Sequence, residues 1–307
     1  MMIMTTKRAW QLGLEMIGRP PRDDQELHSH LHGDDVFDTR RILSIGGGIL
    51  RHQAWRNLDF ATEHCAINSP HIEWDMKEFR PLPVESGTID VVYSLHTIEH
   101  VQDRHVRHML AESFRALTPG GIVQLTCPDI ALYHRAYLAG DVDFFPHAEV
   151  YAGSSIEQRF LLEFATLMSS ACRIDVETIK IGDNEIRARL GTDLDTAALD
   201  DFCQRIDYDR FYKTFPGAHC NWWTHSKALF FLREAGFSEV AGCGCRHTAP
   251  IPRNADVFDR QMPTRSMFVE GIKPLEDFVC PLNISEWPVG DPIPVPPLVL
   301  APRSRLI

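Results

Sequence analysis

The chain has 307 residues, of which 44% are hydrophobic and 24% are charged. This composition is ordinary for a globular protein and argues against wholesale disorder. The length is enough for one large domain or for a domain with a sizeable elaboration. The formal net charge of -11 opposes attraction to a phosphate backbone, so it argues against a nucleic-acid partner and favours a small-molecule substrate.

The lack of a predicted targeting signal and the pattern of the cysteines predict a cytoplasmic protein. The N-terminal residues carry no long apolar segment followed by a small-residue cleavage site, so no signal peptide is predicted. No apolar run approaches the length of a membrane span. The eight cysteines include no CxxC pair, and we interpret them as reduced thiols. A metal site built on Cys243 and Cys245 is the alternative.

The N-terminal segment, 1–37, is predicted to hold a helix and a connector that could serve as a lid. Apolar residues at helical spacing predict a helix over 7–18, which Gly18 and the following prolines end. Residues 22–38 are polar and include three histidines, His28, His30 and His32. We interpret these histidines as exposed connector residues, with metal binding as the alternative.

Between residues 38 and 130 the pattern is that of a doubly wound α/β sheet. A helix over 103–117 has its apolar residues on one face, and Pro119-Gly120-Gly121 is predicted to end it. Short apolar runs bounded by turn residues predict strands at 41–45, 57–60, 71–75, 89–93 and 122–126. Alternating strands and turns of this kind predict a Rossmann-like, mostly parallel sheet.

The remainder of the chain is predicted as an insertion, a completion of the core and a tail. Residues 131–218 break the α/β rhythm, and we interpret them as a helical insertion that covers the substrate, with an auxiliary core as the alternative. Helices are predicted near 156–172 and 195–206, and a strand-like piece at 176–190. Residues 219–275 complete the core with a helix at 224–235 and strands at 239–243 and 266–272. The tail, 276–307, is rich in proline and predicted to be extended.

Four predicted strand ends carry residues suited to ligand binding, because a doubly wound sheet binds ligands at the carboxyl ends of its strands. Gly46, Gly47 and Gly48 allow close approach of the backbone to a ligand. Asp59 follows the second strand and can accept hydrogen bonds from ribose hydroxyls. Asp75 and Met76 follow the third strand, and the string from Ser94 to His100 follows the fourth.

Together these segments resemble the class I S-adenosylmethionine-dependent methyltransferases, in particular the type 11-like branch. Leu-Pro, a strand, His-x-x-Glu-His and Arg-x-Leu-x-Pro-Gly-Gly follow one another in this chain. This ordered string is specific, and it carries the resemblance. The carrying segments are RILSIGGG (41–48), WRNLDF (55–60), WDMKEFRPLPVESGTIDVVYSLHTIEHV (74–101) and ESFRALTPGGIVQLTCPD (112–129).

The resemblance implies S-adenosylmethionine as the cofactor and assigns roles around it. The three glycines, 46–48, would line its methionine part, and Asp59 would hold its ribose. Asp75 and Met76 would frame its adenine.

At the fourth strand, the resemblance places Leu95 and His96 beside the sulfonium, where the substrate arrives, and Ser94 and Leu95 are assigned to cofactor binding. His96 is the candidate base for an acceptor hydroxyl, with a substrate-pocket or structural histidine as the alternative. Glu99 and His100 would pack near the following helix start.

Two residues depart from the family pattern. Ser44 stands where the family has an acid before the first glycine, and Leu50 stands where it has a third glycine. A nicotinamide dehydrogenase is disfavoured because Arg51 occupies the position of the third glycine in its G-x-G-x-x-G loop. His219, Cys220 and His225 are predicted to pack at a helix start, with a metal site as the alternative, so no metal is expected.

The sequence therefore predicts methyl transfer from S-adenosylmethionine to a small-molecule or sugar acceptor in a biosynthetic pathway. Other chemistry on the same cofactor and non-catalytic binding are the alternatives. No membrane or nucleic-acid partner is expected, and a homodimer is left open.

Overall fold

The computed structural model describes residues 41–47, 56–60, 72–146, 150–243 and 264–275. The predictions for the N-terminal helix, the connector, Gly48 and the Pro-rich tail lie outside these residues. Among the helices within these ranges, none is both long and apolar enough to cross a membrane.

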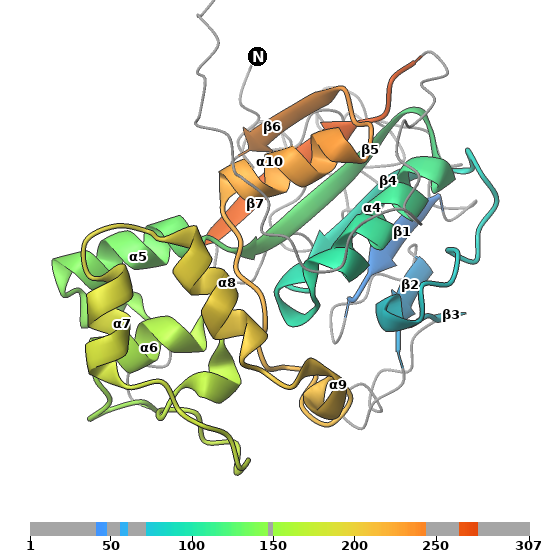
Figure 1. Ribbon diagram of the computed structural model, residues 1–307. Coiled ribbons are helices and arrows are strands. Elements are labelled where there is room, and N and C mark those ends of the chain that lie inside the picture. Colours follow the sequence, from blue (N-terminus) through green and yellow to red (C-terminus); the bar gives the residue numbers. More distant parts are fainter. Residues whose placement is uncertain (1–40, 48–55, 61–71, 147–149, 244–263, 276–307) are drawn as a thin grey trace, which may run out of the picture.

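The described residues form a seven-stranded sheet in the order β3-β2-β1-β4-β5-β7-β6 (Figure 1). Neighbouring strands from β3 to β5 are parallel, and β7 runs antiparallel to both β5 and β6. The order reverses between β1 and β4, which is where such sheets bind ligands. The predicted Rossmann-like, mostly parallel sheet is therefore confirmed. The strands are Ile42–Ile45 (β1), Arg56–Asp59 (β2), Ile72–Glu73 (β3), Ile89–Leu95 (β4), Leu117–Pro128 (β5), Glu239–Cys243 (β6) and Ser266–Ile272 (β7).

Two amphipathic helices cover one face of the sheet. Helix α4, Asp103–Ala116, contacts β5, and helix α10, His225–Glu234, contacts β6 and β7. The two helices also contact each other, where Arg107 forms an ion pair with Glu234 at 2.8 Å. Both helices match the predicted ranges within two residues, since their apolar periodicity is strong.

The predicted role of Pro119-Gly120-Gly121 is wrong. Helix α4 ends at Ala116 and β5 begins at the next residue, so the three residues lie inside the strand. Gly120 has a φ of 78°, and its N–H donates to the carbonyl of Lys273 at 2.9 Å. The register between β4 and β5 shifts beside this segment, between Ile89 and Val91. The glycines therefore form an irregularity within the sheet instead of a helix cap.

The insertion is a helical lobe beside the carboxyl end of β5 (Figure 1). The strand-like piece predicted at 176–190 is wrong, because 183–190 are helical and bury Ile186 and Leu190, four residues apart. The helix predicted over 156–172 ends at Leu162 and is followed by a 3-10 turn. The lobe contains α5 (Ile130–Ala139), η4 (Val142–Phe144), α6 (Ile156–Leu162), η5 (Thr166–Met168), α7 (Asp183–Leu190), α8 (Thr196–Gln204) and α9 (Tyr208–Phe211).

The lobe has its own aromatic core, which also buries one acid. Tyr137 stacks on Phe160 with ring centroids 5.2 Å apart, and Phe160 meets Phe164 edge to face. Burial raises the pKa of Glu163 to about 8, and a hydrogen bond with Tyr133 offsets only part of that effect. Glu163 is therefore protonated in the folded protein at neutral pH.

Replacing this acid should change how stability depends on pH. Between the ordinary pKa of 4.5 and the folded value of about 8, the native state keeps a proton that the unfolded state releases. The free energy of unfolding should therefore fall as pH rises through this window, by a few kcal/mol at about 1.4 kcal/mol for each pKa unit. Glu163→Gln should remove most of this fall, as measured by urea unfolding at several pH values. The exposed Glu177→Gln should keep the wild-type slope, and a wild-type slope in Glu163→Gln would contradict the expectation.

Candidate functional site

The carboxyl ends of β1 and β4 are packed directly against each other. Gly46 has a φ of 68°, and its N–H donates to the carbonyl of Leu58 at 2.8 Å. A Cβ atom on Gly46 would lie 2.1 Å from Cγ2 of Thr97, so no side chain fits there. The Thr97 hydroxyl donates to the carbonyls of Gly46 and Leu95, both at 3.1 Å. Gly46 and the adjacent Gly47 thus present backbone at the ligand-binding edge, as a close-approach loop requires.

Asp59 is the last residue of β2, at the same edge of the sheet. Strand β2 pairs with β1, with Leu58 opposite Ile45, so Asp59 follows immediately beside the glycine loop. One of its carboxylate oxygens, Oδ1, accepts the N–H of Phe60 at 2.9 Å. Its position fits the predicted ribose contact, which stays a prediction.

Asp75 caps the short helix η2, Met76–Glu78, and its Oδ1 atom accepts the N–H of Lys77 at 2.9 Å. The side chain is buried, and two residues that the sequence did not single out reach it from the end of the lobe. The Tyr212 hydroxyl donates to Oδ1 of Asp75 at 2.8 Å, and the Lys213 ammonium lies 3.3 Å from Oδ2. The carboxylate predicted to bind an adenine amine therefore has a partner from within the chain.

The ring of Tyr212 also stacks on Phe60, with centroids 5.1 Å apart and an interplanar angle of 21°. A flat ring against Phe60 with a donor to Asp75 presents the same groups that an adenine would present at this site. If Asp75 binds an adenine as predicted, we expect Tyr212 to compete for the same acceptor oxygen.

Removing the Tyr212 hydroxyl should strengthen cofactor binding. In Tyr212→Phe the adenine amine no longer displaces a hydrogen bond worth about 1 kcal/mol, so the dissociation constant for S-adenosylmethionine should fall by roughly two- to tenfold. Calorimetric titration of both proteins measures this, with Tyr151→Phe as the matched control elsewhere in the lobe. Weaker binding by Tyr212→Phe would mean that the hydroxyl contacts the cofactor itself.

Strand β4 ends at the same edge of the sheet, and its last residues are the next predicted site residues. Ser94 and Leu95 are its last two residues and are both buried. Among the residues that the structure describes, the Ser94 hydroxyl has no hydrogen-bond partner. His96 follows with a φ of 48°, a left-handed conformation that is uncommon for a residue other than glycine. Such strain is often found at functional sites.

The imidazole of His96 is held between a carboxylate and a hydroxyl. Its Nδ1 atom lies 3.0 Å from Oε1 of Glu99, and its Nε2 atom lies 2.9 Å from Oγ of Ser266, the first residue of β7. A proton on Nδ1, shared with the carboxylate, leaves the Nε2 lone pair to accept from the hydroxyl. The ring is therefore oriented to take a proton from a hydroxyl group.

Glu99 is fully buried and ionised among histidines. Burial favours its neutral form, but the hydrogen bond from His96 and the charges of His96, His100 and His219 outweigh it and lower the pKa of Glu99 to about 2. Burial, followed by the charge of His100, lowers the pKa of His219 to about 4. Both Glu99 and His100 belong to η3, Ile98–His100, which precedes α4 as expected.

Residues 219–225, which follow the lobe in the chain, pack against η3. The backbone N–H of Cys220 donates to the carbonyl of Glu99 at 2.9 Å, and the Trp223 indole donates to the carbonyl of Ile98 at 3.1 Å. His225 lies at the start of α10, 3.5 Å from a carboxylate oxygen of Asp129. The structure therefore does not bring His219, Cys220 and His225 together; His219 joins Glu99 and His100 instead.

Sequence comparisons find similar proteins over part of the chain. Residues 54–121 match the family model described as "Methyltransferase domain". A protein of Mycolicibacterium smegmatis, named "Probable S-adenosylmethionine-dependent methyltransferase", is 26% identical over 110 residues, which are 34% of this chain and 42% of that relative. The chain thus matches less than half of that relative's length.

Two solved structures among the matches are named as methyltransferases. A Thermotoga maritima protein described as "SAM-dependent methyltransferase, possible histamine N-methyltransferase" has a TM-score of 0.37 and 13% identity, with 76% of this chain and 82% of that chain covered. A Mesorhizobium loti S-adenosylmethionine-dependent methyltransferase has a TM-score of 0.34 and 15% identity, with 76% and 90% covered. TM-scores this low carry no weight, so the family model and the named relative are what count.

The sheet and its ligand-binding edge define a Rossmann-like α/β protein. Within that class, the match of residues 54–121 to a methyltransferase domain model and the similarity to the named relative support the family resemblance found in the sequence. The name of the relative gives S-adenosylmethionine as the methyl donor of that protein.

Proposed function

We propose that this protein transfers a methyl group from S-adenosylmethionine to a hydroxyl of a small-molecule or sugar acceptor. The observation that carries the proposal is the convergence of Gly46, Asp59, Asp75 and His96 on one edge of the sheet. The first three suit the parts of the cofactor, and His96 suits the proton of the acceptor. The net charge of -11 favours a small acceptor over nucleic acid.

The cofactor supplies an activated methyl group, so the protein's work is alignment and proton removal. Gly46 and Gly47 would hold the methionine part of the cofactor through their backbone, and the Asp59 carboxylate would accept from its ribose hydroxyls. The bound cofactor would supply the methyl group and leave as S-adenosylhomocysteine. Nε2 of His96 would take the proton that the acceptor hydroxyl loses. Glu99 acts as a positioning residue, because its contact with Nδ1 stabilises the imidazolium that forms.

The hydrogen bond from Ser266 to His96 supports the hydroxyl as the acceptor group. In the described structure Oγ of Ser266 occupies the place near Nε2 that an acceptor oxygen would take, at 2.9 Å. Four of the described cysteines are free thiols, which fits the proposed cytoplasmic location. They are Cys127, Cys172, Cys203 and Cys220.

Cofactor binding tests the first half of the proposal. Titration calorimetry should detect S-adenosylmethionine or S-adenosylhomocysteine binding, and Asp59→Ala should weaken it by about tenfold to a hundredfold, because charge-assisted hydrogen bonds contribute about 1.5–3 kcal/mol. Asp90→Ala is the matched control, since Asp90 pairs with Arg41 near the start of β4, at the opposite edge of the sheet. An absence of binding at millimolar cofactor would overturn the proposal.

Turnover tests the second half, once an acceptor is identified by the mass gain of one methyl group. General-base catalysis typically contributes about 10²–10⁴-fold, so His96→Ala should lower kcat by that order and leave cofactor affinity nearly unchanged. His108→Ala, on the outer part of α4, should keep wild-type turnover. A large loss of cofactor affinity with little change in kcat would show that His96 lines the cofactor site and is not the base.

A further inference from the structure

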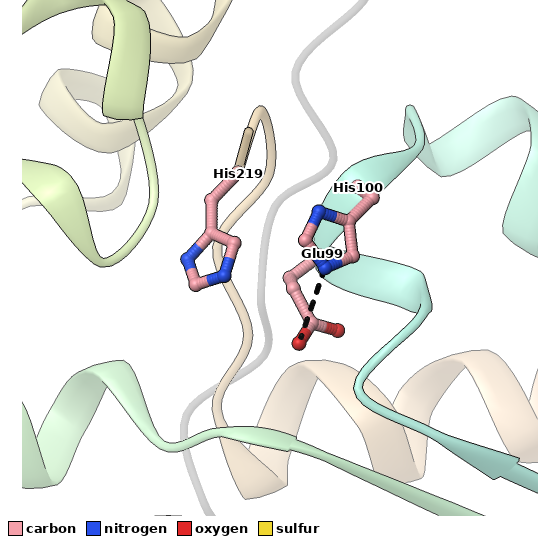
Figure 2. A group of neighbouring side chains, drawn as sticks. All are labelled: Glu99, His100 and His219. Carbon is pink, nitrogen blue, oxygen red and sulfur yellow. Dashed lines mark ion pairs between the residues drawn. The ribbon is translucent and has the colours of Figure 1, made fainter. Parts of the chain in front are cut away.

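Three side chains with metal-ligating atoms meet beside His96, where η3 faces the segment after the lobe (Figure 2). They are Glu99, His100 and His219, and one ligand atom from each lies within 4.8 Å of the others. The Nε2 atom of His100 is 3.9 Å from Oε1 of Glu99. Ligand atoms around a zinc ion at about 2.0–2.2 Å are separated by roughly 3–3.6 Å. Small side-chain rotations would therefore close the three groups around one ion.

Both imidazoles are oriented as metal ligands are. Nδ1 of His100 lies 3.2 Å from the carbonyl oxygen of Ala218, and Nδ1 of His219 lies 2.8 Å from that of Glu163. A carbonyl oxygen only accepts, so each Nδ1 carries the proton, and the neutral ring keeps its lone pair on Nε2. Metal-bound histidines commonly donate their other N–H to a backbone carbonyl in this way, which fixes the tautomer and the ring direction.

The carboxylate of Glu99 supplies an independent observation. Its side chain is 1% exposed, and among the described residues its Oε2 atom has no hydrogen-bond partner. An unpartnered buried carboxylate oxygen is costly, and a cation satisfies it. The backbone also fixes the spacing of the cluster, because the carbonyl of Glu99 accepts from the N–H groups of Cys220 and Asn221 at 2.9 and 3.1 Å. These two residues directly follow His219.

We propose that Glu99, His100 and His219 bind one divalent transition-metal ion. Two imidazoles and one carboxylate form the ligand set of open zinc sites and of non-haem iron(II) sites, so Zn²⁺ and Fe²⁺ are the ions that suit it. The ion would link η3 of the core to the segment that ends the lobe. It would also share Glu99 with His96, and its open coordination position can take a water or an acceptor oxygen. Ion binding does not depend on the proposed methyl transfer.

Direct metal binding tests the site on the full chain, purified without a histidine tag and treated with a chelator. Titration with Co²⁺ should give one ion per chain with visible absorption, and Zn²⁺ should displace it. Thermal unfolding should shift upward by about 5 °C at saturating Zn²⁺. An anaerobic Fe²⁺ titration identifies the preferred ion. His219→Gln and Glu99→Gln should each weaken Co²⁺ binding at least tenfold, whereas His108→Gln should not change it.

The proposal fails if neither Co²⁺, Zn²⁺ nor Fe²⁺ binds the wild-type chain saturably in the micromolar range. It also fails if a folded His219→Gln variant binds Co²⁺ as tightly as the wild type. In either case the two histidines would only pack against Glu99. Circular dichroism verifies folding, and if Glu99→Gln does not fold, His219→Gln and His100→Gln carry the comparison. A failure of S-adenosylmethionine binding with intact metal binding would overturn the proposed function and leave this site standing.

Discussion

The candidate functional site is built around one buried residue, Glu99. Its carboxylate contacts the candidate base His96, and its backbone carbonyl accepts from two N–H groups of the segment that follows the lobe. A buried charge is stable only where neighbouring groups compensate it, so the histidines around Glu99 cannot be removed singly without cost. The same residue thus fixes the direction of the base and attaches the lobe to the sheet.

The lobe reaches both ends of the ligand-binding edge. At one end α9 places Tyr212 against Phe60 and Asp75, and at the other the segment 219–223 packs on η3. The lobe thus touches both the residues predicted to hold the cofactor and those predicted to receive the acceptor.

The sheet could be predicted from the sequence because its strands and two covering helices are local patterns. Apolar runs bounded by glycine, and apolar residues at helical spacing in α4 and α10, identify each element within a few residues. The lobe was harder, since α7 has few apolar residues and the preceding residues look like a strand. The Pro-Gly-Gly segment was misplaced because a glycine that ends a helix and one that allows a strand irregularity look alike in sequence.

The candidate site could be predicted only where its residues are close in sequence. The string from Ser94 to His100 and the acids at strand ends were found in this way. Tyr212 and Ser266 lie 137 and 170 positions from the residues that they contact, so no spacing rule connects them. The sequence groups His219 with Cys220 and His225, because only neighbours in sequence can be paired without the fold; the structure places His219 with Glu99 and His100.

Because β7 runs antiparallel to β5, it begins at the ligand-binding edge of the sheet. A parallel strand contributes only its last residues to the ligand-binding edge, whereas β7 contributes its first, Ser266. The chain therefore reaches the candidate base His96 from a second strand, independent of β4. A substitution at Ser266 would change the hydroxyl beside His96 while the strand order stays the same.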